Sequence, residues 1–139
     1  MNRYVLDTDT LTLLREGQRL VSERALAQPV GSVVTSVITV DEQISSWYTV
    51  LRRAKTPERV SQTDDRLART VVFVSQFPIL GFSLEAISEY DRLLRSKLDV
   101  RANDLRIAAI VLTSNDILVT RNVADFSRVP GLRVENWAD

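Results

Sequence analysis

Four acidic residues are the strongest candidates for chemistry in this chain: Asp7, Glu42, Asp104 and Asp125. Each of them follows a predicted strand or lies at the start of a predicted helix. Asp7, for example, comes directly after an apolar run at residues 4–6 that has the composition of a buried strand. Because the carboxyl ends of parallel strands meet at one edge of a sheet, we expect the four carboxylates to converge on one crevice there.

Carboxylates gathered in one crevice need a counter-ion. Two of them about 4 Å apart repel each other by about 4 kcal/mol at an effective dielectric constant near 20. The sequence contains neither Cys nor His, which excludes thiolate nucleophiles, zinc sites of the Cys type and imidazole bases. Oxygen ligands remain, and these suit Mg²⁺ or Mn²⁺. We therefore expect an acidic pocket that holds one or two such ions, polarises a phosphate and activates a water.

Each acid also has a purely structural interpretation. Asp7 could cap a helix, Glu42 and Asp104 could be first-turn acids that interact with helix dipoles, and Asp125 could be a turn residue. For any one residue the structural interpretation is the more common one. The joint placement of all four at one sheet edge favours the metal site.

The elements that would position these acids alternate along the chain. Apolar and β-branched runs predict strands at residues 4–6, 32–36, 78–82, 117–120 and 132–135. Helical spacing predicts helices at residues 8–17, 19–27, 39–53, 61–75, 83–97 and 104–113, with the third and fourth paired as an antiparallel hairpin. We expect a loop at residues 55–59, Asn103 as the cap of the last helix, and a turn at residues 123–126. This alternation predicts an α/β fold whose parallel sheet is covered on both faces.

Composition limits the other classes of function. A length of 139 residues predicts a single domain that needs no disulfides. The 18 basic and 18 acidic residues cancel, so no overall field attracts nucleic acid, and a polyanion must be held locally. No apolar run approaches the roughly 20 residues of a membrane span, and the beginning of the chain lacks the pattern of a secretory signal. We expect a cytoplasmic protein that makes no contact with a membrane.

Four strings of the sequence, in this order and spacing, resemble the PIN-domain ribonucleases, and most closely the VapC toxins of toxin–antitoxin pairs. They are Tyr-Val-Leu-Asp-Thr-Asp at 4–9, Ser-Val-Ile-Thr-Val-Asp-Glu at 36–42, Asn-Asp-Leu-Arg-Ile-Ala-Ala at 103–109 and Leu-Val-Thr-Arg-Asn-Val-Ala-Asp-Phe at 118–126. The resemblance extends to the string at 130–137 and so covers nearly the whole chain. It implies a PIN-like three-layer α/β/α sandwich with a central parallel sheet of four to five strands, formed by residues 1–139 as one PIN domain.

The resemblance also implies a function. It identifies the chain as the toxin of a type II toxin–antitoxin system, a Mg²⁺-dependent endoribonuclease in which Mn²⁺ can substitute. Asp7, Glu42, Asp104 and Asp125 would bind the metal, and Thr120 and Asn122 would line the same pocket. The substrate would be a structured RNA such as tRNA or ribosomal RNA. An antitoxin would block the pocket, often with an Arg, and the chain would form a homodimer. Trp47 and Tyr48 are candidate contact residues, although core packing explains them equally well.

The sequence departs from the family pattern at three acids. Asp9 stands where the family usually has Asn, so it either adds charge to the pocket or caps the helix. Asp41 and Glu42 point about 100° apart on a helix, so only one can face the pocket, and the motif register favours Glu42. Asp99 is an additional acid, which we expect to be solvated.

Arginines near the candidate acids could hold RNA phosphates. Arg95, Arg101, Arg106 and Arg121 lie within a few residues of Asp104 or Thr120, and the arginine fork matches phosphate oxygens. The alternative is that they are ordinary solvated surface residues.

Two other functions are open at this point. The Asp7-Thr8-Asp9 string is shared with phosphatases of the haloacid dehalogenase type, in which Asp7 would be the nucleophile. That pattern has Thr or Val where this chain has Leu11, and it requires a downstream Lys and a Gly-Asp pair that are not evident. The chain could also be a non-catalytic PIN-like module that binds only protein, but the presence of all four acids argues against this function.

Overall fold

The computed structural model describes residues 2–139 and contains one sheet of five parallel strands in the order β3-β2-β1-β4-β5. The strands are β1 (Tyr4–Leu6), β2 (Val33–Ser36), β3 (Ile79–Leu80), β4 (Ile117–Val119) and β5 (Arg133–Glu135). Leu6 pairs with Thr35 on one side and with Val119 on the other, so the residues that follow these three strands lie at the same edge. The predicted parallel sheet of an α/β fold is confirmed.

Seven helices connect and cover the strands in the part of the chain that is described. They are α1 (Thr8–Arg15), α2 (Arg19–Leu26), α3 (Val37–Arg53), α4 (Pro57–Val74), α5 (Leu84–Arg95), α6 (Ala102–Ser114) and α7 (Val123–Phe126). None of the helices within residues 2–139 combines the length and the apolar character needed to cross a bilayer.

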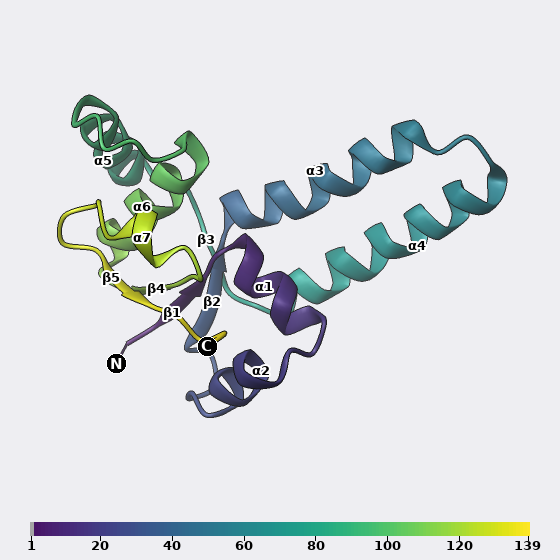
Figure 1. Cartoon of the computed structure of the whole chain (residues 1–139), viewed down its shortest axis with the longest axis horizontal. Coiled ribbons are helices and arrows are strands. Elements are labelled where there is room, and N and C mark those ends of the chain that lie inside the picture. Colours follow the sequence, from purple (N-terminus) through teal and green to yellow (C-terminus); the bar gives the residue numbers. More distant parts are fainter. Residues whose placement is uncertain (1) are drawn as a thin grey trace.

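The two faces of the sheet support separate apolar cores, because successive strand residues point to opposite sides. Val5 and Leu118 pack with Leu93 of α5 and with the apolar residues of α6. Leu6 and Val119 pack on the other face, with the helical residues Leu11, Val21 and Val74. Figure 1 shows α5, α6 and α7 on one side of the sheet and α1 and α2 on the other. The expected three-layer sandwich is therefore confirmed.

Helices α3 and α4 form an antiparallel hairpin that extends away from the layers (Figure 1). The hairpin was predicted, but the expected loop at residues 55–59 was wrong because α4 begins at Pro57. The side chain of Thr56 caps α4 by accepting a hydrogen bond from the amide of Arg59, and proline is favoured at the first helical position. The connection at the tip is correspondingly short.

Two other helix starts differ from the expected ones. α3 begins at Val37, because the Ser36 side chain caps it by accepting from the Thr39 amide, so Glu42 lies beyond its first turn. α6 begins at Ala102, so Asn103 is not its cap; its Oδ1 accepts from Arg106 instead. Residues 123–126 form the short helix α7 rather than a turn.

Candidate functional site

A cavity of about 720 Å³ opens at the edge where the central strands end. It brings together three of the four predicted acids, Asp7 after β1, Glu42 on α3 and Asp104 on α6. The full lining is Asp7, Thr8, Asp9, Thr12, Glu42, Arg101, Asp104, Ile107, Arg121, Asn122, Phe126 and Asp139. Residues far apart in sequence therefore meet at the expected sheet edge.

Asp7 combines the structural role and the cavity position that the sequence left as alternatives. The Asp7 Oδ1 accepts from the Thr10 amide at 2.9 Å and so caps α1. Asp7 is only 8% exposed. Burial raises the pKa of the Asp7 carboxyl above the ordinary value, and the Thr120 side chain and the Thr10 amide oppose that rise. The charge of Asp9 raises it further. The ionised carboxylate of Asp7 is therefore destabilised by its own surroundings.

Glu42 is held by Thr8, a residue to which sequence reasoning gave no role. The Thr8 hydroxyl donates to Oε1 of Glu42 at 2.7 Å and lies 3.2 Å from the Thr39 hydroxyl. Its position directly after Asp7, in the first string of the motif, is the signal that could have identified it. Asp41 does not line the cavity, and its carboxylate lies near the Ser45 hydroxyl instead.

Asp104 is buried and carries a bidentate partner, Arg101. The Arg101 Nε and a terminal nitrogen each donate to one carboxylate oxygen at 3.2 Å, although the Arg101 side chain is 76% exposed. The pair with Asp104 raises the pKa of Arg101, with smaller contributions from the charges of Glu42 and Asp125. The guanidinium therefore lies within the field of three acids.

The fourth acid, Asp125, is next to the cavity rather than in its lining. Its carboxylate accepts from the Asn122 amide at 2.8 Å and lies 3.2 Å from Arg128. Asn122 lines the cavity, and its backbone amide donates to the fully buried Thr120 hydroxyl at 3.0 Å. Of the two residues predicted to line the pocket, Asn122 lines it and holds Asp125, whereas Thr120 is buried outside the lining and accepts from the Asn122 backbone.

Two of the four candidate arginines reach the cavity. Arg121 lines it and donates to Asp9 at 2.7 Å, so Asp9 lies at the rim as half of an ion pair. Arg106 lies outside, with its guanidinium 4.8 Å from the centre of the Tyr90 ring. Arg95, near the end of α5, does not line the cavity either. Asp99 has a positive φ and an exposed side chain outside the cavity.

The donor atoms of the cavity suit a hard cation, but their present positions do not form a ready-made cage. They are the carboxylate, hydroxyl and amide oxygens that Mg²⁺ and Mn²⁺ prefer. Within residues 2–139, no three acidic side chains are grouped closely enough to hold a metal ion. Two of the acids instead have partners within the protein: Thr8 donates to Glu42, and Arg101 donates to Asp104. A cation at Asp104 therefore competes with Arg101.

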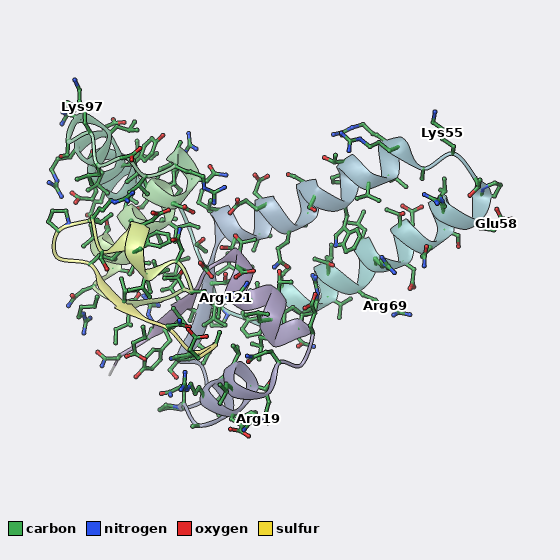
Figure 2. The ribbon with its side chains drawn as sticks, viewed as in Figure 1. Arg19, Lys55, Glu58, Arg69, Lys97 and Arg121 are labelled. Carbon is green, nitrogen blue, oxygen red and sulfur yellow. The ribbon has the colours of Figure 1, made fainter. Side chains whose placement is uncertain are left out.

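The positions of the lysines argue against an aspartyl-phosphate mechanism. The chain has only Lys55 and Lys97, and neither lines the cavity. Figure 2 shows Lys55 at the tip of the hairpin and Lys97 on the opposite side of the molecule. The cavity thus lacks the Lys that a phosphatase with Asp7 as nucleophile would require.

Comparisons with known proteins agree with this architecture. The PIN domain family matches residues 4–132. Ribonuclease VapC2 of Rickettsia felis is 30% identical over 109 residues, which cover 75% of this chain and 72% of that protein. The tRNA(fMet)-specific endonuclease VapC of Salmonella typhimurium is 26% identical over 142 residues and covers 99% of both chains.

Solved structures share the fold over nearly the full length. The structure of VapBC2 from Rickettsia felis, bound to a DNA fragment from its promoter, superposes with a TM-score of 0.70 at 26% identity and covers 96% of this chain and 98% of that one. VapBC-5 from Mycobacterium tuberculosis, a member of the VapBC family of toxin-antitoxin systems, has a TM-score of 0.60 at 25% identity and covers 98% of both chains.

The raised pKa of Asp7 gives a stability prediction. Because this pKa is higher in the folded than in the unfolded chain, the folded chain binds more protons between the two values, and stability falls as pH rises through that window. Asparagine cannot ionise and caps helices as well as aspartate does. Asp7→Asn should match the wild type below pH 3.8 and have the higher free energy of unfolding at neutral pH, by about 1.4 kcal/mol for each tenfold change in proton affinity.

Urea denaturation below pH 3.8 and at neutral pH measures the difference in free energy of unfolding between Asp7→Asn and the wild type. The matched control is Asp41→Asn, which makes the same substitution at an acid outside the cavity. A variant Asp7→Asn that is less stable than the wild type at neutral pH would show that the carboxylate is not penalised by burial.

Proposed function

The chain belongs to the PIN-domain family and, within it, to the VapC ribonucleases, and from this we propose that it is a metal-dependent endoribonuclease and the toxin of a type II toxin–antitoxin pair. The observation that carries the proposal is the single cavity into which Asp7, Glu42 and Asp104 project from three separate elements. An all-oxygen donor set at the carboxyl edge of a parallel sheet suits the hydrolysis of a phosphodiester.

The acids would hold the cation, and their neighbours would hold the acids. We assign Asp7, Glu42, Asp104 and Asp125 as the metal-binding residues, with Mg²⁺ as the cofactor and Mn²⁺ as a substitute. When bound, such an ion lowers the pKa of a water and stabilises charge on a phosphate oxygen. Thr8 orients Glu42, and Asn122 orients Asp125, each through one hydrogen bond. Burial disfavours the charge on Asp7, and a bound cation would offset that cost.

Arg101 and Arg121 are the residues of the cavity that suit an RNA phosphate. Both guanidiniums are largely exposed at the rim, and both are engaged by carboxylates, Asp104 and Asp9. If a phosphate and a metal ion bind together, each ion pair is replaced: the guanidinium donates to the phosphate, and the carboxylate binds the metal ion. Arg95 and Arg106 lie outside the cavity and have no part in this exchange.

We assign the substrate to the single-stranded regions of a structured RNA, in the tRNA or ribosomal RNA class. Bases in loops are unstacked and accessible to side chains, whereas the bases of an RNA helix are not. The full-length similarity to an endonuclease named for tRNA(fMet) supports the tRNA class.

The partners follow from the same family. We propose a cytoplasmic antitoxin whose inhibitory segment places an Arg among Asp7, Glu42 and Asp104, and a homodimer of the toxin. The VapBC structures with this fold support the antitoxin. Of the two candidate contact residues, Tyr48 is 48% exposed and suits the dimer contact better, whereas the Trp47 indole is partly buried, with its N–H bonded to Thr70 at 2.8 Å.

RNA cleavage should depend on the acids of the cavity and on a divalent cation. Asp7→Asn and Asp104→Asn should each lower the rate of tRNA cleavage in Mg²⁺ by ~10²-fold or more, because each removes a charge that holds the cation. EDTA should abolish cleavage by the wild type. Asp41→Asn, the exposed neighbour of Glu42, is the matched control and should cleave normally. Equal cleavage by wild type and Asp7→Asn, with and without EDTA, would refute the proposed function.

Removing Arg101 should tighten cation binding. The guanidinium occupies both oxygens of Asp104, so Arg101→Ala should bind Mn²⁺ about three- to tenfold more tightly in the absence of RNA. Titration calorimetry measures this affinity directly. Arg106→Ala, on the same helix but outside the cavity, should leave it unchanged. Weaker binding by Arg101→Ala would show instead that the guanidinium positions Asp104 for the cation.

The assembly has a simple test in light scattering. The toxin alone should have a mass of about twice 15.7 kDa, and addition of the antitoxin should increase the mass and suppress tRNA cleavage. A mass of 15.7 kDa at micromolar concentration would contradict the homodimer, and undiminished cleavage in a stable complex would contradict occlusion of the cavity.

A further inference from the structure

A groove lined by arginines runs along the α3–α4 hairpin, apart from the acidic cavity. It consists of two hollows that share Trp47 and Arg66, one of about 520 Å³ that reaches Arg15 on α1 and one of about 350 Å³ that reaches Arg53 near the hairpin tip. The α4 residues of the two hollows recur at steps of three or four, so they lie along one side of the helix. They are Arg59, Gln62, Arg66, Arg69 and Phe73, with Thr63 and Thr70 beside them. We call this continuous surface the hairpin groove.

The charge of the hairpin groove is only partly compensated: Arg69 pairs with Asp65, and Glu16 lines the inner hollow, against five arginines in the two hollows together. Among residues 2–139, Arg53, Arg59 and Arg66 take part in no ion pair. Arg15 donates only to neutral groups, Gln43 and Thr70. In a chain with no net charge, this concentration of cations along a concave surface attracts a polyanion.

An aromatic ring lies at the middle of the hairpin groove. The Trp47 indole is fixed by its hydrogen bond to Thr70, and the Arg66 guanidinium lies 5.8 Å from the ring centre. Alternating guanidiniums and aromatic faces are the surface that single-stranded nucleic acids use, with phosphates on the cations and bases stacked on the rings. An acidic peptide would pair with the arginines but would make no comparable use of the indole.

The inner end of the hairpin groove adjoins the acidic cavity. Arg15 donates to Oε1 of Gln43, whose amide nitrogen donates to the Thr8 carbonyl at 3.2 Å and to the Thr12 hydroxyl at 3.0 Å. Thr8 and Thr12 line the acidic cavity. Along α4 the groove extends from Arg59 to Phe73, about 21 Å at the helical rise, which is long enough for a few nucleotides.

We propose that the hairpin groove is a second RNA-binding site, which holds a single-stranded segment of the substrate that flanks the bond cleaved in the acidic cavity. This inference rests on the proposed function, because it takes RNA as the substrate. The groove supplies affinity through phosphates and one stacked base, while the cavity supplies the cleavage.

Neighbouring arginines near the end of α3 give a matched pair for the test. Arg53 lines the hairpin groove, whereas the adjacent and exposed Arg52 does not. Each arginine is changed to Glu in the Asp7→Asn chain, which does not cleave RNA. Binding of a fluorescein-labelled single-stranded oligoribonucleotide is then measured by fluorescence anisotropy at several salt concentrations. Arg53→Glu should raise the Kd about tenfold and lower the salt dependence, while Arg52→Glu should change the Kd less than twofold. Equal effects of the two variants would overturn the proposal.

Tryptophan fluorescence tests the stacking separately. Trp137 is buried in the core, so the quench on addition of the oligoribonucleotide should come from Trp47 and should be lost in Trp47→Phe. Binding without a quench would overturn the stacked base. A poly-glutamate peptide that binds as tightly and competes with the oligoribonucleotide would assign the groove to an acidic protein segment instead.

Cleavage separates this inference from the function on which it rests. With Asp7 intact, Arg53→Glu should cleave at the wild-type rate a short oligoribonucleotide that is too small to reach the groove. For a long oligoribonucleotide that does reach it, the KM should be raised. If no RNA is cleaved by any chain while the Arg52 and Arg53 difference in binding persists, the proposed nuclease falls and the RNA-binding groove stands. An unchanged KM for the long substrate would overturn the groove alone.

Discussion

Repulsion between carboxylates at one edge of the sheet is the constraint on which the site depends. The register of β1, β2 and β4 brings the acids to that edge, where their charges repel, and burial makes the charge of Asp7 costly as well. The structure relieves the cost acid by acid, with a different partner for each. Asp7 accepts from the Thr10 amide, Asp9 from Arg121, Glu42 from Thr8, Asp104 from Arg101 and Asp125 from Asn122. The carboxylates that suit a metal ion therefore have partners within the protein that stabilise them when no ion is bound.

The sequence contained enough information for the sheet and for the position of the acids. Short apolar runs followed at once by polar residues predict strand ends, and parallel pairing brings those ends together. The starts of the helices were less accessible, because they depend on which side chain caps them. Ser36 caps α3 three residues before Thr39, and Thr56 with Pro57 starts α4 inside a segment that looked like a loop. The spacing of apolar residues identifies the buried face of a helix, but it does not show which side chain caps the helix and therefore where the helix begins.

The partners of the acids were only partly predictable. Arg101 and Asp104 are three residues apart on one helical face, so their pairing follows from spacing. The pair of Arg121 with Asp9 joins residues 112 positions apart and depends on the arrangement of the strands. Arg106 looked equivalent to Arg101 in the sequence, yet its guanidinium lies against Tyr90 on another face of α6. Nearness along the chain is thus a weak guide to which arginines reach a site.

The two groups of arginines imply an order of events for a neutral protein that binds a polyanion. Within residues 2–139, Arg53, Arg59 and Arg66 form no ion pair with a carboxylate, so under the proposed function they would attract RNA without breaking one. Arg101 and Arg121 must first leave Asp104 and Asp9, an exchange that is favourable only when a phosphate and a cation replace both partners. The unpaired arginines would therefore act in the first encounter, and the paired ones only once the RNA reaches the acids. Because Arg101 and Arg121 are already paired, the cavity would discriminate against anions that arrive without a metal ion. Unpaired surface arginines do not make this distinction.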